Sequence, residues 1–218
     1  MKIIQNFLPK LRQHLLSHIV DTGALRGQTE NCPDKVLFKH DRIYLHHILR
    51  INYTTYDVRR SQDVVNASTL HCNVMVLAEE NADQDPSQFH PFCYARVLGV
   101  YHVNVVYMGP GIVGYEPRRM EFLRVRWYRA VGVIGWRDYK LDCIRFPPLA
   151  DEDAFGFIDP SDVLRACHII PSFARGKTHS DGRRLSLCAR DSSDWAAYYV
   201  NWCVHTIFRF RDFSDPLP

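Results

Sequence analysis

The stretch RMEFLRVRWY, residues 119–128, decides the fold class of this chain. Leucine, valine and tryptophan at the odd positions 123–127 alternate with Arg124 and Arg126. Successive side chains of a β-strand point to opposite faces of the sheet. The alternation therefore predicts a half-buried strand with an apolar inner face and a basic outer face.

Segments of similar texture surround this strand and are rich in β-branched and aromatic residues, with turn formers between them. They are Val36–Phe38, Tyr44–Ile51, His71–Leu77, Tyr94–Met108, Met120–Tyr128, Leu141–Phe146 and Arg165–Ile170. Short strands at this spacing are typical of a meander or barrel. We expect a mainly β (α+β) fold, built as a twisted, partly closed β-barrel.

The two ends of the chain have a different pattern of apolar residues. Apolar residues recur at helical spacing over residues 7–20, which predicts an N-terminal helix that ends at Gly23 and Gly27. Aromatic residues over 192–210, after a possible cap at Ser192, favour a C-terminal helical segment. The valine, tyrosine, threonine and isoleucine residues of that segment also suit a strand, so both interpretations stay open.

These patterns divide the chain into three parts. Residues 1–35 form an N-terminal helix and linker, 36–173 the β-barrel-like domain, and 174–218 a basic loop followed by the C-terminal helical segment. A length of 218 residues suits one sizeable core rather than two.

Composition excludes several classes of protein. Apolar residues make up 46% and charged residues 23%, which are the values of a globular rather than a disordered chain. No apolar run is long enough to span a membrane, and polar residues interrupt the N-terminal stretch that a signal peptide would need. We expect an intracellular protein, nuclear or cytoplasmic, that is not secreted.

The seven cysteines are widely spaced and form no C-x-x-C pair. Their odd number and apolar surroundings predict buried free thiols in a reducing compartment. Ligand pairs with the spacing of a zinc site are not found. The neighbours Cys167 and His168 would point to opposite faces of a strand, so no metal site is expected.

Catalytic motifs are equally sparse. GPGIVG, residues 109–114, fits a glycine-rich nucleotide-binding pattern, but Pro117 and a further strand follow it where a helix would be required. A hairpin loop is the better interpretation. No G-x-S-x-G occurs, and no cysteine has a basic setting that would activate it. We expect a protein without catalytic activity or cofactor.

The basic strand is the best candidate binding site. Arg124 and Arg126 share its outer face, and Arg129 lies at its end. Their guanidinium groups could contact phosphates or an acidic protein surface, and Trp136 could add a stacking surface. The alternative is a solvated strand face that discourages edge pairing.

Five long segments resemble a family of uncharacterised, transposon-associated proteins of basidiomycete fungi. They are INYTTYDVRRSQD (51–63), HPFCYARVLGVYHVNV (90–105), RMEFLRVRWY (119–128), DAFGFIDPSDVLRACHIIPSF (153–173) and ARDSSDWAAYYVNWCV (189–204). In that family this region is the C-terminal part of longer chains. The family continues with a basic, glycine-rich tail where this chain ends at DFSDPLP, which leaves open a truncated gene copy.

A second resemblance concerns residues 42–173. The strand with Val125-Arg126-Trp127-Tyr128, a later acidic loop and the apolar stretch Val163–Ile170 are similar to bromo-adjacent homology (BAH) domains. That resemblance implies a distorted β-barrel that binds nucleosomes or other chromatin partners without catalysis of its own.

Together these patterns favour a non-enzymatic interaction module in a mobile-element context, with DNA, nucleosomes or an acidic protein surface as the expected partner. Two alternatives remain at this point. One is a degenerate folded fragment without a selected ligand. The other is an accessory subunit of a transposase or nuclease, since the chain lacks the spaced carboxylates that two-metal DNA chemistry requires.

Overall fold

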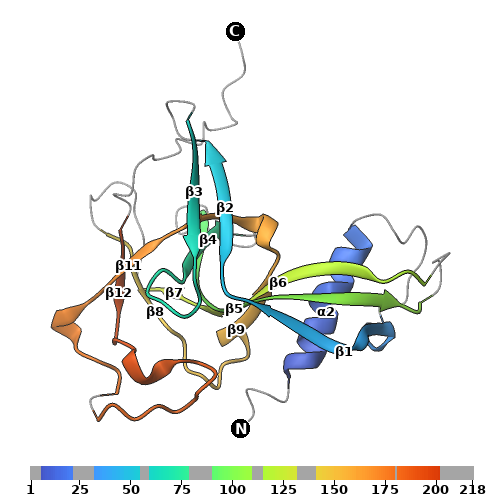
Figure 1. The fold of residues 1–218 in the computed structure, drawn as a ribbon. Coiled ribbons are helices and arrows are strands. Elements are labelled where there is room, and N and C mark those ends of the chain that lie inside the picture. The colour runs from blue at the N-terminus through green and yellow to red at the C-terminus, as the bar shows by residue number, and fades with distance from the viewer. Residues whose placement is uncertain are drawn as a thin grey trace.

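A computed structural model describes most of the chain (Figure 1). The described residues are 6–21, 32–54, 59–78, 90–109, 115–131, 141–179 and 181–201. Within these ranges the protein is mainly β, with one α-helix. The elements are α2 (Phe7–Asp21), β1 (Val36–His46), β2 (Leu49–Thr54), β3 (Arg60–Val65), β4 (Asn73–Leu77), β5 (Phe92–Tyr107), β6 (Arg118–Trp127), β7 (Arg129–Ala130), β8 (Cys143–Arg145), β9 (Phe155–Ile158), β10 (Val163–Ala166), β11 (His168–Pro171) and β12 (Tyr198–Asn201), with short 3-10 turns between them.

The predicted N-terminal helix is confirmed as α2. Leu11, Leu15, Leu16 and Ile19 recur at helical spacing, so all four fall on one buried stripe. This stripe packs against β1, β5 and β6 in one apolar cluster that includes Phe122 of β6. The two glycines expected to end the helix lie outside the described residues.

The strands form three sheets rather than a barrel. The largest has six strands in the order β10-β4-β5-β6-β9, with β1 paired to β5 off this path. The second has the order β11-β12-β8-β7, and β2 and β3 form a two-stranded sheet. The mainly β class is confirmed. The strand path through the described residues is open, so no closed barrel is found.

A β-bulge lets the long β5–β6 pair serve two cores. The register of β5 against β6 shifts between Val97 and Gly99, which reverses the faces of the residues beyond it. Before the bulge Val97 packs with Val125 in one core, and after it Val103 packs with Phe122 in the core under α2. Each fully buried aliphatic side chain contributes about 1.5–3 kcal/mol, so both faces of the pair are stabilised by burial.

A third apolar cluster joins the second sheet to the first. Tyr94 of β5, Tyr128, Ile144 of β8 and Tyr198 of β12 are buried there together. Tyr198 pairs with Ile144 across β12 and β8, and β12 also pairs with β11. The C-terminal part of the chain is thereby built into the β-rich body.

Two local expectations from the sequence have different outcomes. Residues 198–201 form strand β12, so the expected C-terminal helical segment is not shown, and residues 202–218 lie outside the described part. Tyrosine and valine suit a pleated surface, which explains the strand. β5 and β6 are consecutive antiparallel partners, as the hairpin interpretation of residues 109–114 requires, although residues 110–114 are not described.

The six described cysteines are all free thiols. Cys72 is buried and the others are partly buried. Burial raises the pKa of the Cys72 thiol and that of Cys167. Among the described residues, no helix has both the length and the apolar character needed to cross a membrane.

Candidate functional site

The arginines of β6 were expected to face solvent, and for Arg126 that expectation is wrong. Arg126 is only 4% exposed. Its Nη1 donates to the Asp194 carboxylate and, at 3.5 Å, to the backbone carbonyl of Ala189. The guanidinium carbon also lies 3.8 Å from the centre of the Phe146 ring. The outer face of the strand is covered here, and Arg126 is part of the interior.

A second arginine completes this buried cluster. Arg96 of β5 is the register partner of Arg126, so both guanidinium groups leave the sheet on the same side. Arg96 Nη1 donates to Asp194 Oδ1 at 2.7 Å, and Asp194 thus bridges two cations. Burial lowers the pKa of Arg96, but nearby Tyr128 and Asp194 raise it by more, so the net shift is upward. The cluster holds the C-terminal segment on the sheet.

The segment that carries Asp194 is itself ordered by a buried carboxylate. Asp191 is 1% exposed and accepts hydrogen bonds from the backbone N–H groups of Leu185 and Ser186 at 2.8 and 3.1 Å. Burial alone would raise the pKa of Asp191, but these N–H groups and His179 lower it by more. The charged carboxylate therefore fixes the loop that delivers Asp194.

The other predicted site residues are not brought together. The Arg124 guanidinium carbon lies 5.1 Å from the ring centre of Phe7, on helix α2. Arg129 is exposed and its Nη1 is 3.5 Å from Asp151 Oδ2. Trp136 lies outside the described residues. The expected array of three outward arginines beside a stacking surface is therefore not found in the described part of β6 and β7.

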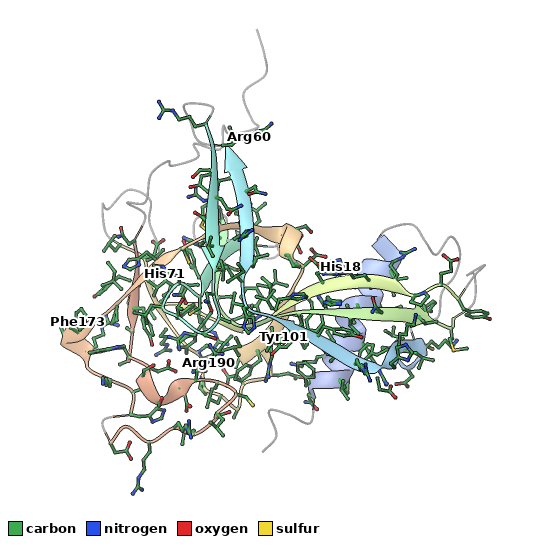
Figure 2. All side chains as sticks on the ribbon, in the orientation of Figure 1. His18, Arg60, His71, Tyr101, Phe173 and Arg190 are labelled. Atoms are coloured by element: carbon green, nitrogen blue, oxygen red, sulfur yellow. The ribbon has the colours of Figure 1, made fainter. Side chains whose placement is uncertain are left out.

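A different basic surface projects from the body. The ribbon formed by β2 and β3 packs against β10, and its tip projects beyond the other sheets (Figure 1). Its strands pair in register from Leu49↔Val65 at the base to Thr54↔Arg60 near the tip. Each strand has six residues, which corresponds to a length of about 20 Å. Figure 2 shows Arg60 at the far end of this ribbon.

The inner face of the ribbon is anchored to the body. Ile51 and Val65 are buried in the core beneath it. Opposite Ile51, Asp63 Oδ2 accepts hydrogen bonds from Arg165 Nε at 2.7 Å and from the Ala166 N–H at 3.0 Å. The Arg165 guanidinium carbon also lies 3.4 Å from the ring centre of Tyr53. These contacts fix the direction in which the ribbon projects.

The opposite side of the ribbon, called here the outward ribbon face, is exposed and, apart from Val64, polar. Its six residues are Arg50, Asn52, Thr54, Arg60, Gln62 and Val64. It contains no carboxylate, because Asp63 lies on the inner face. Within the described ranges, Arg50 and Arg60 form no ion pair. Two uncompensated cations therefore flank a row of neutral hydrogen-bonding groups.

The sequence contained a signal for this ribbon. Leucine, isoleucine and tyrosine at the odd positions 49–53 alternate with Arg50, Asn52 and Thr54. That is the same period-2 pattern as in RMEFLRVRWY, and it predicts one apolar and one polar face. The second strand, RSQDVV, has no clean alternation and carries Asp63 on its inner face. The hairpin was missed because only its first strand has a clear pattern.

His90 and the pair His46–His102 are further candidates for chemistry. His90 Nε2 lies 3.1 Å from Asp142 Oδ2, and its Nδ1 lies 2.6 Å from the Phe92 carbonyl oxygen. Both ring nitrogens are therefore engaged. His46 Nε2 and His102 Nδ1 are 2.6 Å apart on the surface of β1 and β5. Among the described residues, no group of three histidine, cysteine or acidic side chains could hold a metal ion.

No protein-family model, curated protein sequence or solved structure matches this chain.

Proposed function

We propose that this chain is a non-enzymatic interaction module that binds duplex DNA through the outward ribbon face. The observation that carries the proposal is the composition of that face: two exposed arginines, two amides and a hydroxyl, without a carboxylate. Arginine is the side chain best suited to phosphate oxygens because its planar fork donates two parallel hydrogen bonds.

The shape of the ribbon supports DNA over a flat acidic protein surface. The major groove of B-DNA is about 12 Å wide and admits a two-stranded β-ribbon. The β2–β3 ribbon has only two strands, about 5 Å apart. The tip of the ribbon projects beyond the other sheets (Figure 1), and the outward face is turned away from the core that the inner face covers.

DNA is also one of the partners that the sequence led us to expect, but we assign the contact to the outward ribbon face and not to the arginines of β6. Arg126 holds the interior together, so it is not assigned a role in binding. Arg50 and Arg60 take over the electrostatic contact, while Arg129 remains an exposed arginine elsewhere on the body. The resemblance to transposon-associated fungal proteins that is expected from the sequence would be compatible with a DNA-directed role.

The test is a salt titration of binding to a random-sequence DNA duplex, followed by fluorescence anisotropy between about 50 and 200 mM salt. Each phosphate contact contributes about 0.9 to the slope of log K against log salt. The double variant Arg50→Ala/Arg60→Ala should therefore reduce the slope by about 1.8.

A matched control replaces an exposed arginine away from the ribbon. Arg175→Ala removes one exposed positive charge near β11 and should leave the slope unchanged. Equal binding to poly-glutamate would identify a general anion surface and would overturn the proposal. So would a DNA affinity that does not respond to the Arg50→Ala/Arg60→Ala change.

A further inference from the structure

The centre of the outward ribbon face holds a preorganised pair of amides. Asn52 and Gln62 are direct register partners, and the Gln62 Nε2 donates to Asn52 Oδ1 at 2.7 Å. Both residues are exposed. The bond restricts the rotation of two side chains that would otherwise move freely in water, which lowers the entropy lost when the pair binds a ligand.

This bond leaves a defined set of groups for a ligand. An amide side chain has two N–H donors and one oxygen acceptor. After the bond between them forms, both N–H groups of Asn52 remain, together with the Gln62 oxygen and its second N–H. The pair thus offers a donor and an acceptor side by side on one exposed surface.

Adenine is the base whose edge fits that set. In the major groove adenine presents the N7 acceptor next to the N6 amino donor, whereas guanine presents two acceptors and cytosine a donor. A side-chain amide is the group that pairs with both adenine atoms at once. A donor from Asn52 would face N7, and the Gln62 oxygen would accept from N6.

The flanking residues place phosphate contacts where a groove-bound ribbon needs them. Arg50 lies one row toward the base of the ribbon and Arg60 one row toward its tip, on opposite strands. Rows on one face are about 7 Å apart. The two arginines therefore lie about 13 Å apart along the ribbon, on either side of the amide pair, close to the width of the major groove.

We infer that the Asn52–Gln62 pair reads adenine in the major groove of duplex DNA, while Arg50 and Arg60 hold the flanking phosphates. This assignment rests on the proposed function and adds sequence selectivity to it. Phosphate contacts fix the position of a protein on DNA but carry no sequence information, whereas contacts to base edges do.

The experiment selects bound duplexes from a random-sequence DNA library with the full chain. The expected result is an enriched sequence with adenine at one or more fixed positions. Replacement of those adenines by 7-deazaadenine, which removes the N7 acceptor and keeps base pairing, should weaken binding about 2- to 13-fold for each adenine, the effect of one lost hydrogen bond. The double variant Asn52→Ala/Gln62→Ala should lose the same preference and keep the salt slope of the unmodified protein.

Gln13→Ala is the matched control, because Gln13 is an exposed amide on α2 far from the ribbon. It should leave selectivity unchanged. The enriched sequence made as duplex RNA should bind without selectivity, since the major groove of A-form RNA is too narrow to enter.

The outcomes separate the two proposals. If random-sequence DNA binds with an Arg50- and Arg60-dependent slope but no sequence is enriched, base reading is overturned and DNA binding stands. An enriched sequence that tolerates 7-deazaadenine or the Asn52→Ala/Gln62→Ala change also overturns base reading. A complete lack of DNA binding overturns both.

Discussion

The β6 strand and the β2 strand share one sequence pattern but have opposite environments. In each, apolar residues alternate with residues that include arginine, and the apolar side faces a core. On β6 the other side is covered, and Arg126 is 4% exposed against a carboxylate. On β2 the other side stays open, and Arg50 is exposed.

The difference lies in what the rest of the chain supplies. Asp194 reaches Arg126 from 68 positions further along the chain. It arrives on a segment that is fixed by Asp191 and by strand β12. No described segment lies over the outward ribbon face in the same way. Whether an arginine has a structural role or is available for binding therefore depends on whether another segment covers it. The sequence of its own strand does not determine this.

The largest expected effect comes from the removal of the buried carboxylate. Asp194→Ala leaves the Arg96 and Arg126 guanidinium groups buried without their shared anion. Loss of one partner of a buried ion pair typically costs about 3–5 kcal/mol of the free energy of unfolding. Urea denaturation measures this loss.

Glu121→Ala is the control for that change. It removes a carboxylate from an exposed pair with Arg119, where both side chains are about half exposed. Such pairs contribute about 0–1 kcal/mol. If Asp194→Ala lowered the free energy of unfolding no more than Glu121→Ala does, Arg96 and Arg126 would not have the structural role assigned to them. The contrast between β6 and β2 would then be wrong.

A second prediction concerns helix α2, which packs against β1, β5 and β6 and carries His14. Burial, and secondarily His18, lowers the pKa of His14 from 6.5 to about 4, while Asp159 acts in the opposite direction. Between these values the unfolded chain binds a proton that the folded protein excludes. Above about pH 6.5 the proton binding of His14 does not affect the free energy of unfolding. As the pH falls from 6.5 toward 4, the free energy of unfolding decreases by up to about 3 kcal/mol.

Urea denaturation at about pH 7, 6 and 5 measures this dependence. The variant His14→Phe keeps an aromatic ring beside Phe157 but cannot be protonated. It should flatten the dependence in this window. A dependence that persists unchanged in His14→Phe would assign the effect to another group.

A smaller effect is expected where the ribbon meets the body. Asp63→Ala removes the acceptor for Arg165 Nε and for the Ala166 N–H. The loss should be about 2 kcal/mol, since hydrogen bonds to charged groups contribute about 1.5–3 kcal/mol. Asp181→Ala, in an exposed pair with Arg183, is the matched control and should change stability little.

The smallest effect is expected on the outward ribbon face. Arg50→Ala/Arg60→Ala should change the free energy of unfolding by no more than about 0.5 kcal/mol, because both residues are exposed and unpaired within the described ranges. A larger loss in urea denaturation would mean that these arginines are structural as well, and the contrast with β6 would disappear.

Much of the fold could be predicted from local patterns. Helix α2 and strands β1, β4, β5 and β6 each overlap a segment whose periodicity predicted them. The turn at Pro160–Asp162 has proline at its first position, and the Asp159 side chain before it accepts from the Ser161 N–H. Strand β9 was not predicted, and for the segment that contains β12 the sequence left helix and strand open, because four residues carry too little pattern to decide.

The candidate site was predicted at the wrong strand for a related reason. Period-2 alternation tells which residues share a face, but it does not tell whether a distant segment covers that face. The β6 strand was the stronger candidate from sequence because several arginines lie close together along it. The outward ribbon face has only Arg50 and Arg60 among neutral groups.

The sequence by itself determined the local elements, because hydrophobic periodicity and turn chemistry act over a few residues. It also determined which side chains share a face of each strand. Tertiary structure alone decided that Arg96 and Arg126 meet Asp194 in the interior and that Arg50 and Arg60 remain in water. The physical reason is that burial depends on contacts between segments far apart in the chain, and a guanidinium is held inside only where a distant carboxylate compensates its charge.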